Sequence, residues 1–547
     1  MTDSKGKVLD AIVVGTGMAG LYMIKRLNDQ GLNIQAFEAG SGVGGAWFWN
    51  RYPGCRADLP IIEYSYSFSK ELQQEWDWTE VMAGQPEIER YLNHVADRFD
   101  LRKDIKFETK VTDAIYNEDS NTWTVKTDQG DTYTCTYCIM ATGCLNEPNY
   151  PDFPNADSFK GDVYHTAQWP REGVDLTGKR VAIVGCGSSG VQAIPQIAKQ
   201  AKELIAFQRS PVYTFPARNA PMNPAFLAQA KKDYEEIRER QRNNEMGIAN
   251  YNGPKRAPDP NKPPKPRPSK KILEITPEQR KQEIKDFGIN VLSLYADTYF
   301  NPEANEIACE LYREYLKETL DAQKAEALSP KNYPLHCKRP VIDTEYYAAF
   351  KQDNVSIVDL RESPVAEVTS TGLRTTKANY EFDVLVYATG FDAMTGTIKR
   401  MNIRGRDGLL LADKWKDGPR MYMGLQSVGF PNFFTTTGPG SPSVVSNVLH
   451  SIEQHVEWID NCIAYLRAHK VKTIEPELAA EDAWVEHVNK AAQGSMMTAP
   501  TCNSWYLGTN IEGKPRGFMP YLAGTKTYRE ECDAVVENGY QGFSLAS

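Results

Sequence analysis

We predict an α/β protein built around two copies of one supersecondary unit, and three observations support this fold class. An apolar strand over residues 11–14 runs directly into a glycine-rich turn over residues 15–20 and then into a helical pattern. The same order of strand, glycine-rich turn and helix returns at residues 181–190. Each copy also ends in a similar strand that finishes with Ala-Thr-Gly, at residues 138–143 and 384–390. This pattern predicts two Rossmann-like dinucleotide-binding domains.

The composition is that of an ordinary globular protein. The 547 residues carry a formal net charge of −9, with 41% hydrophobic and 24% charged residues, which excludes disorder and fibrous repeats. The acidic balance argues against a nucleic-acid partner. No apolar run reaches the ~18 residues of a membrane-spanning helix, and the N-terminal residues lack the pattern of a signal peptide. We therefore expect a cytoplasmic protein with no membrane or nucleic-acid partner.

The first unit has the features of a dinucleotide-binding turn. Gly15 permits the tight turn, Gly17 lets the backbone approach a pyrophosphate, and Gly20 lets the helix pack on the strand. The positive N-terminal end of the helix then faces the phosphates. A second apolar strand over residues 34–37 leads to Glu38, whose carboxylate can accept a hydrogen bond from a ribose hydroxyl.

The second unit differs at the position that contacts the ribose. Arg209 lies 24 residues after Gly185 and is followed by Ser210. Glu38 lies at nearly the same distance, 23 residues, after Gly15. An arginine at this position can bind the 2′-phosphate that a carboxylate would repel. We therefore infer that the first unit binds FAD and that the second binds NADPH rather than NADH.

The order of these segments places the NADP-binding domain inside the FAD-binding domain. The predicted bounds are 1–150 for the first part of the FAD domain, 151–222 for a linker and the first part of the NADP domain, 223–328 for a helical insertion, 329–391 for the second part of the NADP domain, and 392–547 for the second part of the FAD domain. The insertion is charged and free of strand patterns, and we expect it to lie on the NADP domain. Its segment Gly253 to Lys271 is rich in proline and basic residues, which favours an exposed loop.

The cysteines exclude one class of flavoprotein. A disulfide reductase of this architecture needs a redox-active pair, commonly C-x4-C, soon after the first glycine-rich turn. Cys55 is the only cysteine between residues 40 and 58. Ten cysteines are too few for a disulfide scaffold, and the pair Cys135 and Cys138 has no second pair that would complete a zinc site. We expect reduced structural thiols and no metal site.

The segment between the two units carries the most specific motif. Residues 159–170 read FKGDVYHTAQWP and match the pattern F-x-G-x-x-x-H-x-x-x-W-P. This pattern is the fingerprint of the type I Baeyer–Villiger monooxygenases, a family of flavoproteins. The chain resembles this family over nearly its whole length, and the motif lies between the two nucleotide-binding turns as it does in the family.

The resemblance implies a reaction and its partners. Members of the family use FAD and NADPH to insert one oxygen atom of O2 beside the carbonyl of a ketone, through a C4a-peroxyflavin, and release an ester or lactone. The attacking oxygen is anionic, so the site needs a fixed cation. By the resemblance Arg339 supplies this cation, and Asp58 holds and tunes it. We expect a ketone substrate and O2 as partners, and a monomer or weak homo-oligomer.

The sequence and the resemblance together predict the residues that hold the cofactors. For FAD they are Gly15, Gly17, Gly20, Glu38, Gly45, Trp47, Asp58, Tyr64, Val111 and Val448. For NADP they are Gly185, Gly187, Ser188, Ser189, Gly190, Arg209, Ser210, Lys338, Arg339 and Trp505. Lys338 is expected to help Arg209 bind the 2′-phosphate. The resemblance places Trp505 in a mobile loop near residues 495–515 that covers NADPH.

Two questions stay open at the level of sequence. His165 lies in the fingerprint, where the resemblance implies a conformational role that couples cofactor movement to domain position; direct proton transfer is the alternative. The alternative function is that of a flavin-containing monooxygenase that oxidises nitrogen or sulfur. A non-catalytic flavin-binding protein would keep the glycines but would have no use for Asp58, Arg339 and Trp505 together.

Overall fold

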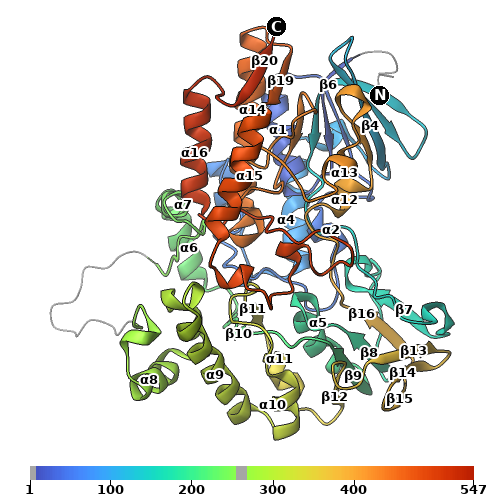
Figure 1. The fold of residues 1–547 in the computed structure, drawn as a ribbon, viewed down its shortest axis with the longest axis vertical. Coiled ribbons are helices and arrows are strands. Elements are labelled where there is room, and N and C mark those ends of the chain that lie inside the picture. The colour runs from blue at the N-terminus through green and yellow to red at the C-terminus, as the bar shows by residue number, and fades with distance from the viewer. Residues whose placement is uncertain (1–7, 254–267) are drawn as a thin grey trace, which may run out of the picture.

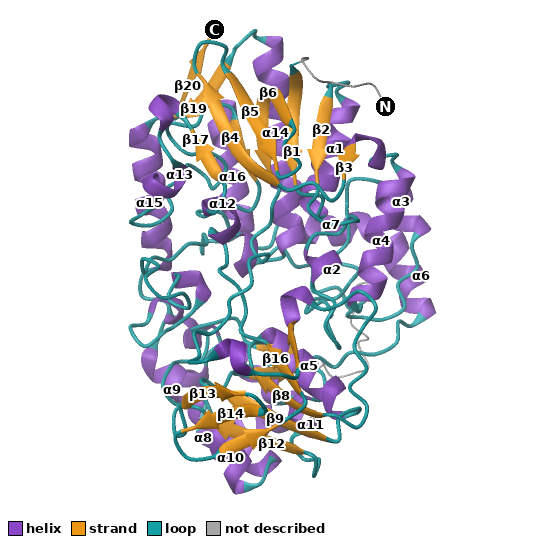
Figure 2. Cartoon of the chain, turned by 90° about the vertical axis from the view of Figure 1, so that its right-hand side faces the viewer, coloured by secondary structure: helices purple, strands orange, loops and turns teal. Residues whose placement is uncertain are grey.

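The computed structural model describes residues 8–253 and 268–547, so most of the proline-rich segment, residues 254–267, lies outside the described residues. Two halves lie one above the other, and each is built on its own sheet (Figure 1). The upper half contains the larger sheet and both ends of the chain, and the lower half contains the second sheet (Figure 2).

The sheet of the upper half has the strand order β17-β4-β5-β6-β1-β2-β3, with β18 paired to β6. Its strands are β1 (Leu9–Val14), β2 (Ile34–Phe37), β3 (Ile105–Lys106), β4 (Val111–Asn117), β5 (Thr122–Thr127), β6 (Thr132–Met140), β17 (Asn402–Arg404) and β18 (Phe433–Thr435). β1 pairs in parallel with β2 and β6, so that Val14 lies beside Phe37 and Met140. The carboxyl ends of these three strands therefore meet at one edge of the sheet.

The sheet of the lower half is wholly parallel, with the order β12-β9-β8-β16-β7. Its strands are β7 (Asp162–His165), β8 (Arg180–Val184), β9 (Glu203–Gln208), β12 (Val355–Asp359) and β16 (Val384–Tyr387). All five fall between β6 and β17 of the upper sheet in the sequence. This nesting confirms the predicted fold class, two Rossmann-like domains of which the second is inserted in the first.

Helices cover both sheets, and three small sheets complete the fold. The α-helices of the described residues are α1 (Met18–Asp29), α2 (Ala46–Trp49), α3 (Lys70–Glu75), α4 (Gln85–Arg98), α5 (Ser188–Ala198), α6 (Pro224–Lys232), α7 (Tyr234–Arg242), α8 (Pro277–Phe287), α9 (Pro302–Thr319), α10 (Ala322–Leu328), α11 (Tyr346–Ala349), α12 (Gly396–Lys399), α13 (Leu411–Lys414), α14 (Val448–Ala468), α15 (Leu478–Ala492) and α16 (Thr525–Glu537). The small sheets pair β10 (Thr214–Pro216) with β11 (Val341–Asp343), β14 (Gly372–Thr375) with β13 (Val365–Thr369) and β15 (Asn379–Glu381), and β19 (Thr473–Pro476) with β20 (Phe543–Ala546). In the part of the chain that the structure describes, no helix has the length and apolar character needed to span a membrane.

The two glycine-rich turns share the same close contacts. Gly15 has φ +98° and Gly185 has φ +109°, a backbone region that favours glycine. A Cβ atom on Gly20 would lie 2.0 Å from the carbonyl oxygen of Gly15, and one on Gly190 would lie 2.2 Å from that of Gly185. Because these glycines lack side chains, α1 and α5 begin directly over the turns with their free N–H groups facing the space beyond the strands.

The helical insertion packs on both halves. Leu227 of α6 and Tyr234 of α7 belong to the apolar core of the upper half, as does Tyr251. Ile272 and Tyr312 belong to the core of the lower half. The insertion therefore does not lie on the NADP domain alone, because the apolar side chains of α6 and α7 face the core of the FAD domain.

Two of the ten cysteines are joined to each other. Cys337 and Cys502 lie 165 residues apart in the sequence and form a disulfide, with their Cα atoms 5.5 Å apart. The other eight cysteines are free, including Cys135 and Cys138. The expectation of reduced thiols is wrong for the joined pair, because the spacing of cysteines in a sequence does not show which of them meet in the fold.

His165 lies between the two chain segments that join the halves, which we call the linkers. One contains Asn149 and the other contains Thr389. It ends β7, beside β16, and its Nδ1 accepts a hydrogen bond from the N–H of Ala167. This leaves Nε2 as the donor to the hydroxyl of Thr389 at 3.3 Å, and that hydroxyl donates in turn to the carbonyl of Asn149. Burial lowers the pKa of His165 to about 4, so the ring is neutral at pH 7.

We predict that His165 makes the stability of the protein depend on pH. The ordinary histidine pKa is 6.5, so the unfolded chain binds a proton that the folded chain excludes, and stability is lost as the pH falls from 6.5 towards 4. His165→Gln should make the unfolding free energy less dependent on pH in this range, by up to about 1.4 kcal/mol per pH unit. Urea unfolding of both proteins at pH 5 and pH 7 measures the difference, and equal pH dependence would contradict a buried neutral ring.

Replacing Gly190 with alanine should destabilise the lower half. The added Cβ atom would lie 2.2 Å from the carbonyl oxygen of Gly185, and relieving such overpacking costs about 1–3 kcal/mol. Gly187→Ala is the matched control, because a Cβ atom there meets no other atom within 4 Å. Thermal unfolding should show a lower melting temperature for Gly190→Ala alone. An unchanged melting temperature would show that the helix can move without cost.

Candidate active site

A cavity of about 1890 Å³ lies between the two halves, at the carboxyl ends of strands from both sheets. Ligands of Rossmann-like folds bind at this edge of the sheet. The predicted residues that line the cavity are Gly15, Gly17, Glu38, Gly45, Trp47, Asp58, Tyr64, Val111, Val448, Gly185, Gly187, Ser188, Ser189, Arg209, Ser210, Lys338, Arg339 and Trp505. Gly20, Gly190 and His165 do not line it, because the two glycines lie behind their turns and His165 is buried at the end of β7.

Hydrogen bonds from Thr16 and Gly40 hold the carboxylate of Glu38 in place. Thr16 donates to one carboxylate oxygen from its backbone N–H at 2.9 Å and from its hydroxyl at 2.8 Å. The N–H of Gly40 donates to the other oxygen at 2.8 Å. A carboxylate can accept about four hydrogen bonds, so the oxygens keep capacity for a ribose hydroxyl on the cavity side. This fixed acceptor fits the adenosine end of FAD.

A narrow backbone channel leads from Glu38 to an aromatic wall. A Cβ atom on Gly45 would lie 2.7 Å from the Cα atom of Gly17, so neither position has room for a side chain. Beyond this approach Trp47 donates from Nε1 to the hydroxyl of Tyr64 at 3.3 Å, and burial raises the pKa of that hydroxyl. A channel lined by backbone fits a pyrophosphate, and the aromatic wall fits a flat ring. The residues present therefore suit FAD.

Helix α14 contributes to the same wall. Val448 in its first turn lines the cavity, as does Val111 from β4. The N-terminal end of a 21-residue helix carries partial positive charge. Negative charge that develops on a ring bound at this end of the cavity would be stabilised by it.

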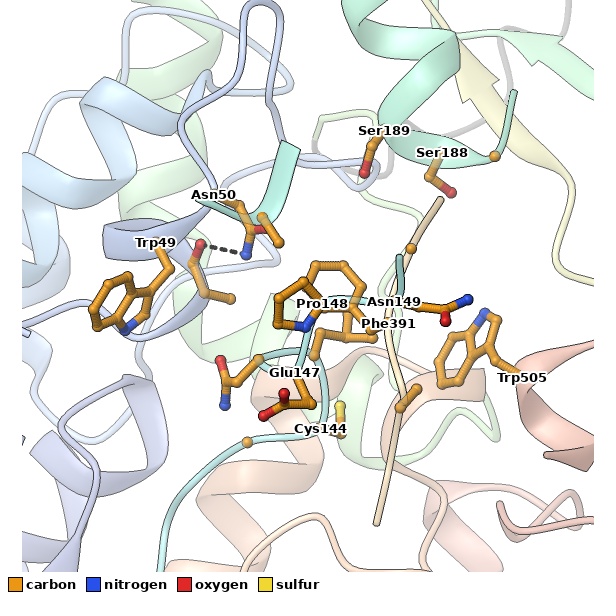
Figure 3. A pocket seen from close by; sticks show the side chains of 18 of the residues that line it. Trp49, Asn50, Cys144, Glu147, Pro148, Asn149, Ser188, Ser189, Phe391 and Trp505 are labelled. Carbon is orange, nitrogen blue, oxygen red and sulfur yellow. Dashed lines mark hydrogen bonds between the residues drawn. The ribbon is translucent and has the colours of Figure 1, made fainter. Parts of the chain in front are cut away.

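Two cations, Arg209 and Lys338, line the part of the cavity beside the second sheet, which we call the second niche. Arg209 follows β9, and Lys338 precedes β11, with its Nζ over the ring of Tyr333 at 5.2 Å. Burial lowers the pKa of Lys338, and the charge of Arg209 lowers it further. Ser188 and Ser189 project toward the pocket from the start of α5 (Figure 3). A doubly charged group such as a 2′-phosphate would relieve the repulsion between the two cations and accept hydrogen bonds from the serines.

Arg339 and Asp58 meet inside the cavity from opposite halves of the chain. Nη2 of Arg339 donates to Oδ2 of Asp58 at 2.9 Å, although the two residues are 281 positions apart. Nη1 of Arg339 lies 3.4 Å from the carbonyl oxygen of Val444. Asp58 raises the pKa of the arginine. The side chains are 31% and 47% exposed, so the pair is accessible to a ligand in the cavity.

The residues that follow Asp58 lie in the core of the upper half or fasten other segments to it. Ile61 and Ile62 are buried in the core of the upper half. Glu63 is also buried, and its carboxylate accepts hydrogen bonds from the N–H groups of Ala249 at 2.7 Å and Tyr251 at 3.0 Å. Glu63 therefore fastens the helical insertion to the FAD domain. Sequence reasoning missed this role because the partners are 186 and 188 residues away.

The C-terminal loop reaches the cavity from its other side. Trp505 begins a 3₁₀ turn (Trp505–Leu507) and lines the cavity, as does Asn149 (Figure 3). The hydroxyl of Ser504 and the side-chain carbonyl of Asn510, both in lining residues, are buried without a hydrogen-bond partner among the described residues. Buried polar atoms without partners are costly, so these two indicate a ligand on which the loop closes.

One contact between the halves also escaped sequence reasoning. The hydroxyl of Tyr52 donates to Oε1 of Gln192 at 2.8 Å, which joins the segment after α2 to helix α5. Gly54 lies against the same helix, where a Cβ atom would be 2.3 Å from the carbonyl oxygen of Gln192. Glycine at position 54 therefore sets how closely the two halves approach beside the cavity. The only sequence signal was a glycine in an aromatic-rich run.

Comparisons with known proteins agree with this geometry. The family model of pyridine nucleotide-disulphide oxidoreductases matches residues 12–239. A Baeyer–Villiger monooxygenase of Pseudooceanicola batsensis is 39% identical over 542 residues, which cover 98% of this chain and 96% of the relative. Two solved structures are similar over their whole length. Oxidised steroid monooxygenase bound to NADP is 45% identical, with 99% of this chain and 100% of that chain covered at a TM-score of 0.90. The complex of OTEMO with FAD and NADP is 37% identical, with 98% and 99% covered at a TM-score of 0.90.

The match to the pyridine nucleotide-disulphide family reflects the shared nucleotide-binding fold, since the C-x4-C pair of disulfide reductases is absent from the segment after the first turn. The relatives that align over the whole chain include the region of Asp58, the fingerprint and Arg339. Identity of 39% over 98% of the chain places the protein by its full length rather than by one motif. The chain belongs to the type I Baeyer–Villiger monooxygenases, a family of flavoproteins that use FAD and NADPH.

Proposed function

We propose that the cavity binds FAD and NADPH together and catalyses the oxidation of a ketone by O2 to an ester or lactone. The observation that carries this proposal is the Arg339–Asp58 ion pair, which brings a fixed cation into the cavity between the two nucleotide niches. An enzyme that only passes a hydride to its flavin would not require such a cation. A reaction in which an anionic oxygen attacks a carbonyl does.

FAD, when bound, accepts a hydride from NADPH and activates O2 for transfer of one oxygen atom. Arg339 keeps its positive charge throughout the ordinary pH range, as arginine side chains do, and Asp58 raises its pKa further. Its remaining N–H groups can donate to an anionic oxygen, and such donors act most strongly where they are fixed in advance and water is excluded. Asp58 acts as a positioning residue: it orients the guanidinium and offsets part of its charge.

The other residues of the site bind and orient. Glu38 accepts from a ribose hydroxyl of FAD, while Arg209, Ser210 and Lys338 bind the 2′-phosphate of NADPH. Trp505 covers the nicotinamide half of NADPH and excludes water from the reacting atoms. These assignments rest on the placement of each side chain in the cavity wall.

Three parts of the proposal rest on composition and family resemblance. They are O2 as the second substrate, a cytoplasmic location, and a monomer or weak homo-oligomer in solution.

The purified holoenzyme should convert members of a ketone panel to esters or lactones in the presence of NADPH and labelled O2, with one labelled oxygen atom in each product by mass spectrometry.

Arg339→Ala should retain FAD, because Arg339 lies away from the Glu38 niche, and should lose about 100- to 1000-fold in the rate of oxygen insertion, the usual effect of removing one stabilising donor.

Arg180→Ala is the control for this variant. Arg180 pairs with Asp383 at the start of β8 and does not line the cavity, so its loss should leave the rate unchanged. Full ketone oxidation by Arg339→Ala would refute the role of the arginine. Oxidation of sulfides or amines, together with failure on every ketone, would replace the proposed function by that of a nitrogen- or sulfur-oxidising monooxygenase.

Arg209→Ala should weaken the binding of NADPH far more than the binding of NADH. A charge-assisted hydrogen bond is worth about 1.5–3 kcal/mol, so the KM for NADPH should rise about 10- to 100-fold while the KM for NADH changes little. Arg209→Lys keeps the charge without the forked geometry and should give an intermediate value. Steady-state kinetics with both nucleotides measures the ratio, and an equal effect on both would contradict binding of the 2′-phosphate at this position.

A further inference from the structure

The disulfide between Cys337 and Cys502 lies beside the two segments that the proposed reaction depends on most. Cys337 directly precedes Lys338 and Arg339, and Cys502 lies three residues before Trp505. Both cysteines are buried, at 0% and 1% exposure. The covalent link therefore joins the arginine segment to the loop over residues 494–515, which we call the covering loop.

Apolar packing holds the same two segments together. Cys337 and Cys502 belong to one cluster with Val444, Met497 and Tyr506. This cluster contains residues of the covering loop and of the loop before α14, and Val444 also contacts Arg339 through its carbonyl oxygen. The disulfide thus lies in the apolar cluster that joins the covering loop to the segment of Arg339.

The other contacts of the covering loop are reversible. Lys514 pairs with Asp392 at 2.8 Å, and Asn510 donates to the carbonyl of Phe391 at 2.8 Å. Arg516, which directly follows the loop, donates to the carbonyl of Cys502 at 2.9 Å. Ion pairs and hydrogen bonds of this kind break and re-form readily, whereas a disulfide does not.

We propose that Cys337 and Cys502 form a reversible thiol–disulfide switch that controls whether the covering loop can leave the active site. The inference rests on the proposed function, because it assumes that the loop covers NADPH. In the disulfide form, Trp505 lies three positions along the chain from the link, and the Cα atoms of Cys502 and Cys337 are 5.5 Å apart. The Cα atom of Trp505 therefore stays within about 17 Å of that of Cys337. In the dithiol form only the reversible contacts hold the loop.

The chemistry of the switch is balanced with a peroxide as the oxidant. One cysteine thiolate attacks hydrogen peroxide and becomes a sulfenic acid with release of water, and the second thiol then displaces water and forms the S–S bond. Two thiols and one peroxide thus give one disulfide and two molecules of water. A dithiol reductant reverses the link by thiol–disulfide exchange. In a cytoplasm that keeps thiols reduced, such a bond is expected to be transient rather than structural.

The direction of the effect follows from the position of the link. NADP+ has to leave through the side of the cavity that Trp505 covers, so a loop that cannot open slows product release. Oxidised enzyme should therefore release NADP+ at least about tenfold more slowly than reduced enzyme, and kcat should fall with it. Bound NADP+ should in turn protect the disulfide from reduction, because the buried sulfur atoms become accessible only when the loop opens.

The experiment compares holoenzyme treated with hydrogen peroxide and holoenzyme treated with dithiothreitol. Thiols are counted in denaturant: eight are expected after oxidation and ten after reduction, since the chain has ten cysteines and eight are free. Peptide mass mapping identifies the linked pair. Stopped-flow measurement of NADP+ release and hydrogen exchange over residues 494–515 then report the mobility of the loop without any need for turnover.

Cys502→Ser and the double variant with Cys337→Ser should behave as reduced enzyme under both treatments. If Cys337→Ser, which lies beside Lys338, disturbs folding, Cys502→Ser alone still tests the switch. Cys532→Ser, on helix α16 away from the cavity, is the matched control and should still respond to peroxide.

Ten free thiols after peroxide treatment, or equal NADP+ release and loop exchange in the two forms, would overturn the switch. Loss of ketone oxidation in both forms, with a normal difference in loop exchange, would instead refute the proposed function and leave the switch in place. The two inferences therefore fail in distinguishable ways.

Discussion

The ion pair between Arg339 and Asp58 is the constraint on which the rest of the structure depends. A guanidinium placed in a partly enclosed cavity loses solvation, and a carboxylate partner offsets that cost only at hydrogen-bond distance. The 2.9 Å contact joins residues 281 positions apart, so the two Rossmann-like domains have to meet with their strand ends facing each other. Insertion of one domain in the other provides two linkers for this purpose. Neutral His165 hydrogen-bonds to Thr389 of one linker, and the hydroxyl of Thr389 donates to the carbonyl of Asn149 in the other.

The distribution of charge follows from the two cofactors. The chain as a whole carries a net charge of −9, yet the second niche concentrates Arg209 and Lys338 near Arg339. Burial and the charge of Arg209 lower the pKa of Lys338, and a bound anion would offset both effects. Glu38 holds the equivalent position in the first niche and would repel such an anion. In the proposed assignment, the opposite charges at these matched positions separate a nucleotide that has a 2′-phosphate from one that lacks it.

Features set by neighbouring residues could be predicted from the sequence, and features set by distant contacts could not. The strand, glycine-rich turn and helix of each unit follow from local periodicity and from close contacts such as that of Gly20 with Gly15. Arg339 and Asp58 were found only through the family resemblance, since nothing local marks them as a pair. The attachment of the insertion through Glu63, and the pairing of Cys337 with Cys502, depend on segments about 165 to 190 residues apart that no periodic pattern connects. The sequence therefore predicted the fold better than the contacts that fix the relative position of its two halves.

The covering loop has to meet two opposite demands. In the proposed mechanism it excludes water while the oxygen atom is transferred, which favours strong contacts, and it opens in every cycle, which favours weak ones. The Lys514–Asp392 ion pair and the Asn510 hydrogen bond satisfy both demands, because they are replaced by water when the loop opens. A covalent bond two residues from Arg339 satisfies only the first. The presence of such a bond at this position therefore makes sense physically if its oxidation state changes, and the segment that carries the reactive cation then also sets how long the active site stays closed.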